Sequence, residues 1–168
     1  MRFLAWTKTK PNWTPFRTEW SIYDESNQIA GQVDSLWLNL KNETEREEIV
    51  MVDWKRSAHL LSGDLQVQKD QVYNGQRGLD ASPHSDIPGP CRDLYDVAFN
   101  HYLVQQSLYA HILQSKYGIV VASRYLLQCH PHIGSSDADF NEVLLPVDSE
   151  LSEQVLSAFH GGWKLARG

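Results

Sequence analysis

Two acidic residues and a lysine lie on neighbouring predicted strands. Asp53 and Lys55 close the apolar run IVMV at 49–52, and Asp34 closes the segment GQVD at 31–34. Alternate residues of a strand point to the same face, so Asp53 and Lys55 are expected to lie roughly 6 to 7 Å apart along one side. A carboxylate there can hold a metal ion while the ammonium group contacts a water or a phosphate. For the D-x-K tripeptide alone, a charged end to a buried strand is the simpler interpretation, because short motifs match by chance.

A predicted hairpin positions Asp34. Turn-forming residues at 24–27 join strands expected at 17–24 and 28–39. A two-residue loop would bring Arg17 opposite Asp34 and make Glu19 its diagonal neighbour, whereas a three-residue loop would reverse that parity. Glu19 is therefore either a third acid of the site or a surface acid paired with a basic side chain.

The remaining pattern predicts an α/β fold with a mixed central sheet flanked by helices. The run at about 48–55 is apolar on both faces, which is typical of a central strand. The segment 62–91 is rich in Gly, Ser, Asp, Gln and Pro and predicts an irregular insert. The other expected segments are a charged connection at 41–48, a helix at 93–117, strands at 119–129 and 141–146, and a helix at 149–160 capped by Asp148 or Ser149.

Length and composition indicate an ordinary globular protein. The 168 residues suit one domain over 1–168, with 42% hydrophobic and 21% charged residues. No run approaches the ~20 apolar residues of a membrane span, and the apolar stretch at the N-terminus is too short for a secretory signal. Cys91 and Cys129 form no spacing pattern, which favours free thiols in a reducing, intracellular compartment.

The net charge of −6 argues against a nucleic-acid partner, because lysine and arginine drive phosphate binding. Bound divalent cations would offset several carboxylates. Residues 1–18 also contain four basic and four aromatic residues and no acid. This composition suits the backbone and bases of a single strand, and it equally suits a first strand with a solvated face.

Converging carboxylates predict a hard cation. Glu19, Asp34 and Asp53 supply oxygen ligands of the kind that Mg²⁺ or Mn²⁺ prefers, together with substrate phosphate. Such an ion activates water and neutralises charge on a phosphodiester, which is the chemistry of nucleases. A zinc site at His130 and His132 is the weaker alternative, because no cysteine or third histidine lies at zinc spacing.

The three motifs together resemble a known family. GQVD at 31–34, VDWK at 52–55 and QQSLY at 105–109 within a long predicted helix are similar to motifs of the RecB-like branch of the PD-(D/E)XK nuclease superfamily, which includes mitochondrial genome-maintenance exonucleases. The resemblance covers roughly residues 17 to 130. It implies a restriction-endonuclease-like core, with a mixed sheet between helices.

The resemblance also implies roles for individual residues. Asp34 and Asp53 would ligate the metal, the backbone carbonyl of Trp54 would add a ligand, and Lys55 would position or activate the attacking water. Glu19 resembles an acid that precedes the GxxD strand in some members. Gln105 and Tyr109, one helical turn apart, would contact DNA or support the site.

Two departures from the family pattern concern a histidine and a glutamine. Many RecB-like nucleases complete the metal site with a histidine on a helix upstream of the first strand, whereas all seven histidines here lie at or beyond His59. That helix could be missing, Glu19 could substitute, the chain could be a domain excerpt, or catalysis could be impaired. Gln106 stands where an apolar residue is usual, which costs little if the position is near the surface.

The sequence thus predicts a Mg²⁺- or Mn²⁺-dependent deoxyribonuclease, more an exonuclease on ends or single strands than an endonuclease. Its partner would be DNA with single-stranded ends, with no membrane, and an attached or partner domain is compatible with the sequence. The first alternative is a catalytically silent module of the same fold that binds nucleic acid or a protein. A more remote alternative is an RNA endonuclease on a related core.

Overall fold

The computed structural model describes residues 2–40, 47–73, 94–95, 97–136, 139–146 and 150–157. The chain divides into two compact units, Met1–Leu61 with Ile112–Val147, and Ser62–His111 with Asp148–Gly168. Each unit is described by itself. One domain over the whole chain remains a prediction.

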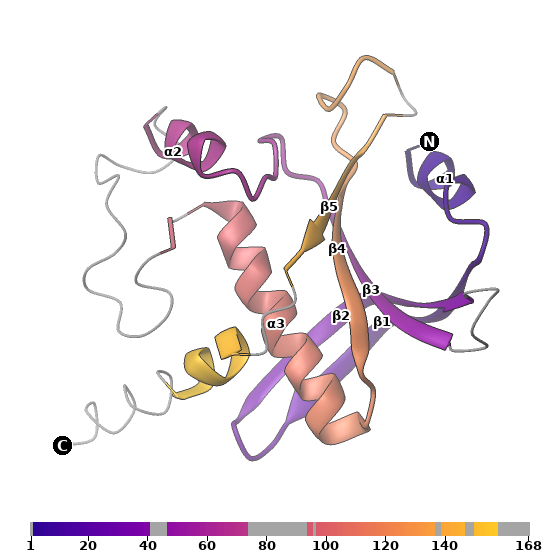
Figure 1. Ribbon diagram of the computed structural model, residues 1–168, viewed down its shortest axis with the longest axis vertical. Helices are drawn as coiled ribbons and strands as arrows, with labels where there is room; N and C mark the ends of the chain where they lie inside the picture. The colour runs from indigo at the N-terminus through magenta and orange to yellow at the C-terminus, as the bar shows by residue number, and fades with distance from the viewer. Residues whose placement is uncertain are drawn as a thin grey trace. The chain divides into compact units, whose positions relative to one another are not determined.

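The first unit is built on a five-stranded sheet in the order β1-β2-β3-β4-β5 (Figure 1). Neighbouring strands are antiparallel except β3 and β4, which are parallel. The α/β class and the mixed sheet are therefore confirmed. The elements of this unit are α1 (Arg2–Lys8), β1 (Trp13–Asp24), β2 (Ile29–Leu40), β3 (Glu47–Lys55), β4 (Val121–Gln128) and β5 (Asn141–Leu145), together with the last residues of α3 (Ala98–Tyr117).

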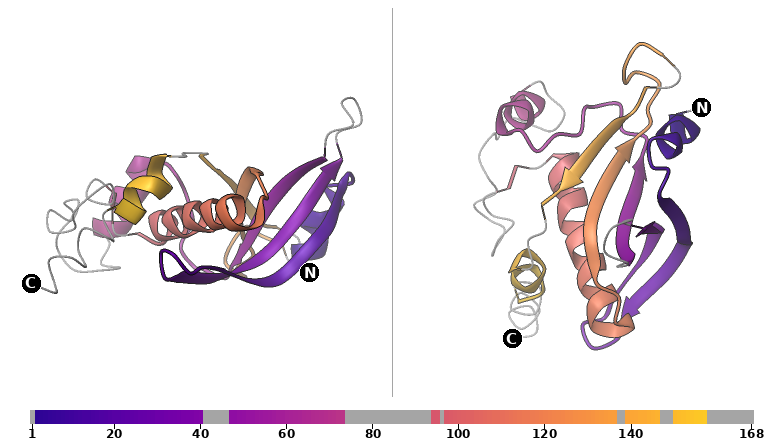
Figure 2. Two further views of the ribbon diagram at one scale, coloured as in Figure 1. Left: turned by 90° about the horizontal axis from the view of Figure 1, so that it is seen from below. Right: turned by 45° about the vertical axis from the view of Figure 1, so that its right-hand side comes forward.

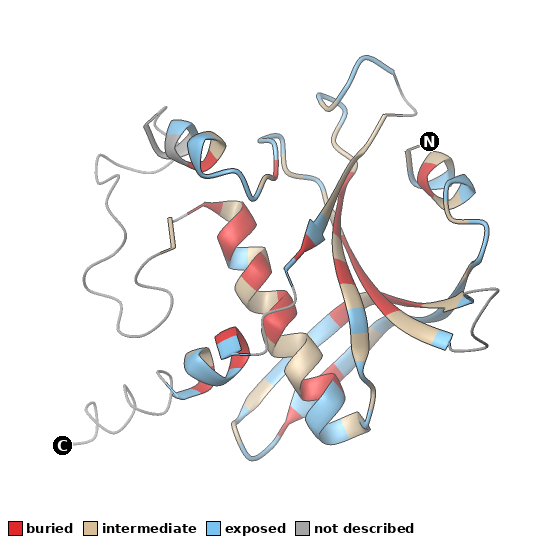
Figure 3. Cartoon of the chain, viewed as in Figure 1, coloured by how far each residue is buried: buried red, intermediate tan, exposed pale blue. Residues whose placement is uncertain are grey.

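The centre of the sheet is buried, as the apolar run predicts. Val50, Met51 and Val52 have no exposed surface, and alternate residues of β3 point to opposite faces, so both faces of this strand are covered. β1, by contrast, is exposed over most of its length (Figure 3). Among the described residues, no helix has the length and hydrophobicity that a bilayer-spanning segment needs.

A cluster of aromatic side chains fills one face of the sheet. Trp6 of α1 is fully buried and packs against Trp37, Val50, Val52 and Leu127. Its ring lies edge-on to that of Trp37, with centroids 5.4 Å apart. α1 lies on the side of the sheet away from the C-terminal end of α3 (Figures 1 and 2).

The N-terminal segment corrects two expectations. Residues 2–8 form a helix rather than the start of a strand, and β1 begins only at Trp13. A helix therefore does precede the first strand, contrary to the expectation that it could be missing, but it contains no histidine. Burial of Trp6 explains why this short segment is helical, because packing of an apolar side chain outweighs weak local preference.

The register of the hairpin differs from the prediction. The loop has four residues, since Asp24 pairs with Ile29, and a bulge lies between Pro15 and Arg17. Arg17 consequently faces Leu36, so its predicted position opposite Asp34 is wrong. Sequence composition located the turn but could not determine how many residues it contains.

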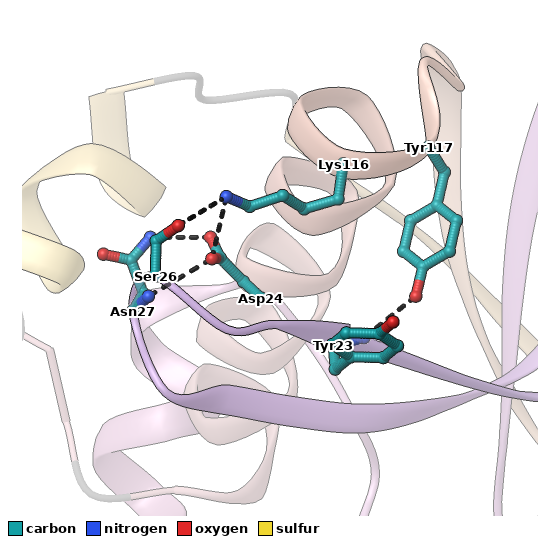
Figure 4. Close-up of polar contacts among 6 residues, drawn as sticks. All are labelled: Tyr23, Asp24, Ser26, Asn27, Lys116 and Tyr117. Atoms are coloured by element: carbon teal, nitrogen blue, oxygen red, sulfur yellow. Dashed lines mark hydrogen bonds and ion pairs between the residues drawn. The ribbon is translucent and has the colours of Figure 1, made fainter.

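Side-chain contacts hold this turn (Figure 4). The buried carboxylate of Asp24 accepts hydrogen bonds from the backbone N–H of Asn27 at 3.2 Å and from its side-chain amide at 2.6 Å. Nζ of Lys116 lies 2.9 Å from the same carboxylate and donates to Ser26 Oγ at 3.1 Å. The turn is thereby tied to the end of α3.

The second unit contains α2 (Leu65–Tyr73), the larger part of α3 and a helix at 150–157. α2 corrects the expectation of an irregular segment from 62. Asp64 Oδ1 caps this helix by accepting the backbone N–H groups of Gln66 at 2.8 Å and Val67 at 3.0 Å. Residues 74–93, which include most of the predicted insert and Cys91, lie outside the described residues, as do 41–46 and the predicted caps Asp148 and Ser149.

α3 begins five residues later than predicted. The carbonyl of Tyr95 accepts the backbone N–H of Val97 at 2.8 Å and the side-chain amide of Asn100 at 2.9 Å. This turn precedes the first helical residue, Ala98. The strands expected at 119–129 and 141–146 are confirmed as β4 and β5. The last helix is confirmed over 150–157.

Candidate active site

Asp34 lies where β2 and β3 stop pairing. Ser35 with Val52 is the last backbone pair of the two strands. One residue beyond it, Oδ2 of Asp34 accepts the backbone N–H of Trp54 at 2.9 Å. The side chain thus replaces a ladder hydrogen bond and fixes the Asp34 carboxylate against the end of β3, where Asp53 and Lys55 are located.

Asp53 and Lys55 share one face of β3, as the two-residue spacing predicts. Their Oδ2 and Nζ atoms are 2.5 Å apart. Asp53 is only 2% exposed, and within the described residues its Oδ2 accepts no hydrogen bond of regular geometry despite this ion pair. A buried carboxylate oxygen with one cationic neighbour therefore lies next to Asp34.

The protonation of Asp53 reflects this setting. Burial raises the pKa of Asp53 to about 6, the ion pair with Lys55 opposes the rise, and the nearby carboxylate of Asp34 adds to it. The two residues lie on neighbouring strands, each one position beyond the last backbone pair, Ser35 with Val52. The site thus brings two carboxyl side chains and one lysine together, an arrangement that a divalent cation would stabilise.

The donor set fits a magnesium-type ion only in part. Among the described residues, no three or more His, Cys, Asp or Glu side chains group to hold a metal. Two carboxylates are nevertheless enough for Mg²⁺, which commonly binds one or two carboxylates and completes its shell with water and substrate phosphate. Such an ion would interact with the buried Oδ2 of Asp53, which has no hydrogen-bond partner among the described residues.

Glu19 lies across from Asp34 on the neighbouring strand, and its side chain is exposed. Its neighbours Thr18 and Trp20 pair with Ser35 and Val33, so its backbone lies across from Asp34. The residue adopts a left-handed backbone conformation with φ of 50°, and its side chain is exposed. Its role as a metal ligand remains a prediction.

Trp54 points away from the acids. Its indole packs edge-on against Trp6 with centroids 5.5 Å apart and against Phe3 at 4.9 Å. Trp54 is half-buried and packs against the aromatic cluster on this face of the sheet. Its backbone carbonyl as a metal ligand stays a prediction.

Gln105 and Tyr109 lie on one face of α3, as their spacing predicts. Nε2 of Gln105 donates a hydrogen bond to the Tyr109 hydroxyl at 3.0 Å. Both belong to the second unit, whereas Asp34, Asp53 and Lys55 belong to the first. Their role in binding DNA remains a prediction.

Gln106 corrects the expectation of a position near the surface. The side chain is 1% exposed, and its Oε1 has no hydrogen-bond partner among the described residues. A buried, unsatisfied carbonyl costs about 1–3 kcal/mol. The departure from an apolar residue at this position is therefore more costly than predicted.

The buried amide of Gln128, beside Lys55, forms a hub of hydrogen bonds that was not predicted from the sequence. Gln128 pairs with Lys55 across the parallel strands and is fully buried. Its amide nitrogen donates to the carbonyls of Ser57 at 2.7 Å and His59 at 2.6 Å, and its oxygen accepts from Leu61 N–H at 3.1 Å. This amide holds the chain as it leaves β3. The sequence feature that could have indicated this role is a glutamine directly after Leu126 and Leu127, at the end of an apolar strand.

The histidine pair after β4 is a surface feature. The rings of His130 and His132 are 4.7 Å apart, and Nδ1 of His130 accepts the backbone N–H of His132 at 3.1 Å. No cysteine or acid joins the two rings in a metal-binding group within the described part of the chain.

Comparison with known proteins adds no family assignment. No protein-family model matches the chain, and no curated protein is significantly similar to it.

Proposed function

We propose that the chain is a Mg²⁺- or Mn²⁺-dependent nuclease that hydrolyses phosphodiester bonds of DNA, acting on ends or single strands. The observation that carries this proposal is the convergence of Asp34, Asp53 and Lys55 at the end of β3. The mixed sheet with helices is compatible with the PD-(D/E)XK core that the sequence motifs resemble.

Each residue has a chemical task in this proposal. Asp34 and Asp53 would hold the ion, and their proximity supplies the negative charge that attracts it. A bound Mg²⁺ or Mn²⁺ lowers the pKa of water and neutralises the charge that develops on the phosphodiester. Lys55 orients the attacking water or contacts the phosphate. The water oxygen forms the new bond to phosphorus, the bond to the leaving sugar oxygen breaks, and a proton passes to that oxygen.

The test is cleavage of end-labelled single-stranded DNA by the purified chain with Mn²⁺. Asp53→Ala and Lys55→Ala should each abolish metal-dependent cleavage while circular dichroism stays unchanged. Lys8→Ala removes an exposed lysine from α1 and should cleave like the wild type. Wild-type protein that cleaves neither DNA nor RNA in Mn²⁺ contradicts the proposal.

A silent module of the same fold is the second candidate. The net charge of −6 favours it, as does the convergence of no more than two carboxylates among the described residues. Calorimetric titration with Mn²⁺ separates the two functions, because a silent module has no reason to bind the ion. The same cleavage assay with a single-stranded RNA of matched sequence separates a deoxyribonuclease from an RNA endonuclease.

A further inference from the structure

An exposed aromatic and basic surface lies on the edge strand of the sheet. Phe16 is 43% exposed, Arg17 is exposed, and Trp20 is half-buried. The guanidinium of Arg17 lies 4.5 Å from the centre of the Trp20 ring and 6.0 Å from that of Phe16. We call Phe16, Arg17 and Trp20 the β1 aromatic surface.

The fold holds this surface in place from behind. Tyr117 of α3 meets the Trp20 ring edge-on, with centroids 4.9 Å apart. Arg17 forms no ion pair with an acid in the described part of the chain, although the chain as a whole is acidic. The surface thus offers one cation and two aromatic rings, of which the Phe16 ring belongs to a residue that is 43% exposed.

The same strand is poorly suited to pairing with a further strand. Pro15 has no N–H to donate, a bulge interrupts the register between Pro15 and Arg17, and Glu19 adopts a φ of 50°. Such features protect a sheet edge from association with a second chain. The exposed ring of Phe16 is therefore not explained by a second copy that adds a strand.

The position of the surface relates it to the candidate active site. Thr18 pairs with Ser35 and Trp20 with Val33, so the two pairs flank Asp34 on the adjacent strand. Neighbouring strands lie about 4.8 Å apart. A ligand seated on β1 would thus run next to the strand that carries Asp34.

We propose that the β1 aromatic surface binds a single-stranded segment of nucleic acid, with a base stacked on Phe16 and a backbone phosphate paired with Arg17. Aromatic rings stack on any base, and a neighbouring cation neutralises the backbone. A single strand is favoured over a duplex because only unstacked bases expose a face to a side chain. The link to cleavage rests on the proposed nuclease function, whereas binding itself does not.

The test is the affinity for a fluorescein-labelled oligothymidylate of about 12 nucleotides, measured by anisotropy in EDTA so that cleavage cannot occur. Phe16→Ala should weaken binding at least fivefold. Phe16→Tyr should restore it, because the ring is kept. Arg17→Gln should weaken binding and reduce the slope of log K against log salt by about 0.7.

Matched controls come from exposed positions elsewhere. Leu144→Ala removes a 58% exposed side chain from the opposite edge strand, and Lys8→Gln removes one exposed charge from α1; both should bind like the wild type. Absent wild-type binding, or unchanged binding by Phe16→Ala and Arg17→Gln, overturns the inference. So does a wild-type dimer in sedimentation that Phe16→Ala dissociates. A wild type that fails to cleave with Mn²⁺ but shows the expected losses of affinity supports the inference and contradicts the nuclease proposal.

Discussion

Replacement of Asp53 by asparagine should change how stability depends on pH. The pKa of Asp53 is raised from its ordinary value of 3.8 to about 6 by burial, with Lys55 opposing and Asp34 adding to the rise. Between these two pH values the folded protein binds more protons than the unfolded chain. Stability from this group is therefore present below pH 3.8 and is lost as the pH rises through about 6.

The magnitude follows from the two pKa values. The interval from 3.8 to about 6 corresponds to about 3 kcal/mol, at 1.36 kcal/mol for each pKa unit. Asparagine does not titrate, so the difference in unfolding free energy between wild type and Asp53→Asn should change by most of that amount, about 2 kcal/mol, between about pH 4 and pH 7.

The assay is urea unfolding followed by tryptophan fluorescence at several pH values, in EDTA. Glu153→Gln removes an exposed carboxylate from the helix at 150–157 and should keep the wild-type pH dependence. Asp34→Asn should reduce the dependence in part, since Asp34 contributes to the raised pKa of Asp53. If the unfolding free energies of wild type and Asp53→Asn depend on pH with the same slope, Asp53 does not take up a proton in the folded protein at a raised pKa.

Three further substitutions test packing and polar contacts. Burial raises the pKa of Asp24, but hydrogen bonds from Lys116 and Asn27 outweigh it and leave the pKa below its ordinary value, so the stability from this group is lost as the pH falls into the acid range. Asp24→Asn should lower the unfolding free energy by about 2 kcal/mol at pH 7, a figure limited by the partly exposed Lys116. The unfolding free energy of this variant should also fall less steeply than that of the wild type as the pH becomes acidic. Gln106→Met should raise the unfolding free energy by about 1 kcal/mol in urea titrations, and a loss would show that the buried carbonyl has a partner. Gln128→Leu should cost about 3 kcal/mol and speed hydrogen exchange at Leu61 N–H, whereas unchanged exchange there would show that the amide does not hold this segment.

The strands and the shared face of Asp53 and Lys55 were predictable because they depend on local patterns. The apolar run before Asp53 specifies a strand covered on both faces, and the i,i+2 spacing places Asp53 and Lys55 on one face whatever the rest of the fold does. The helical spacing of Gln105 and Tyr109 likewise predicted their shared face. These features need no knowledge of distant residues.

Other features depend on distant contacts and were missed. The four-residue hairpin loop is held by Lys116 of α3 through Asp24, and α1 is a helix because Trp6 packs on the sheet. The side-chain amide of Gln128 forms hydrogen bonds with residues more than sixty positions away in the sequence. Gln106 became buried through tertiary packing that its local surroundings do not reveal.

The most direct test of the account is the anomalous diffraction of a crystal grown or soaked with Mn²⁺. A peak within bonding distance of both Asp34 and Asp53, and absent from Asp53→Asn crystals, is the predicted result. A fully soaked wild-type crystal with no peak at these two carboxylates, or with its peak at other residues, would contradict the proposed metal-dependent chemistry.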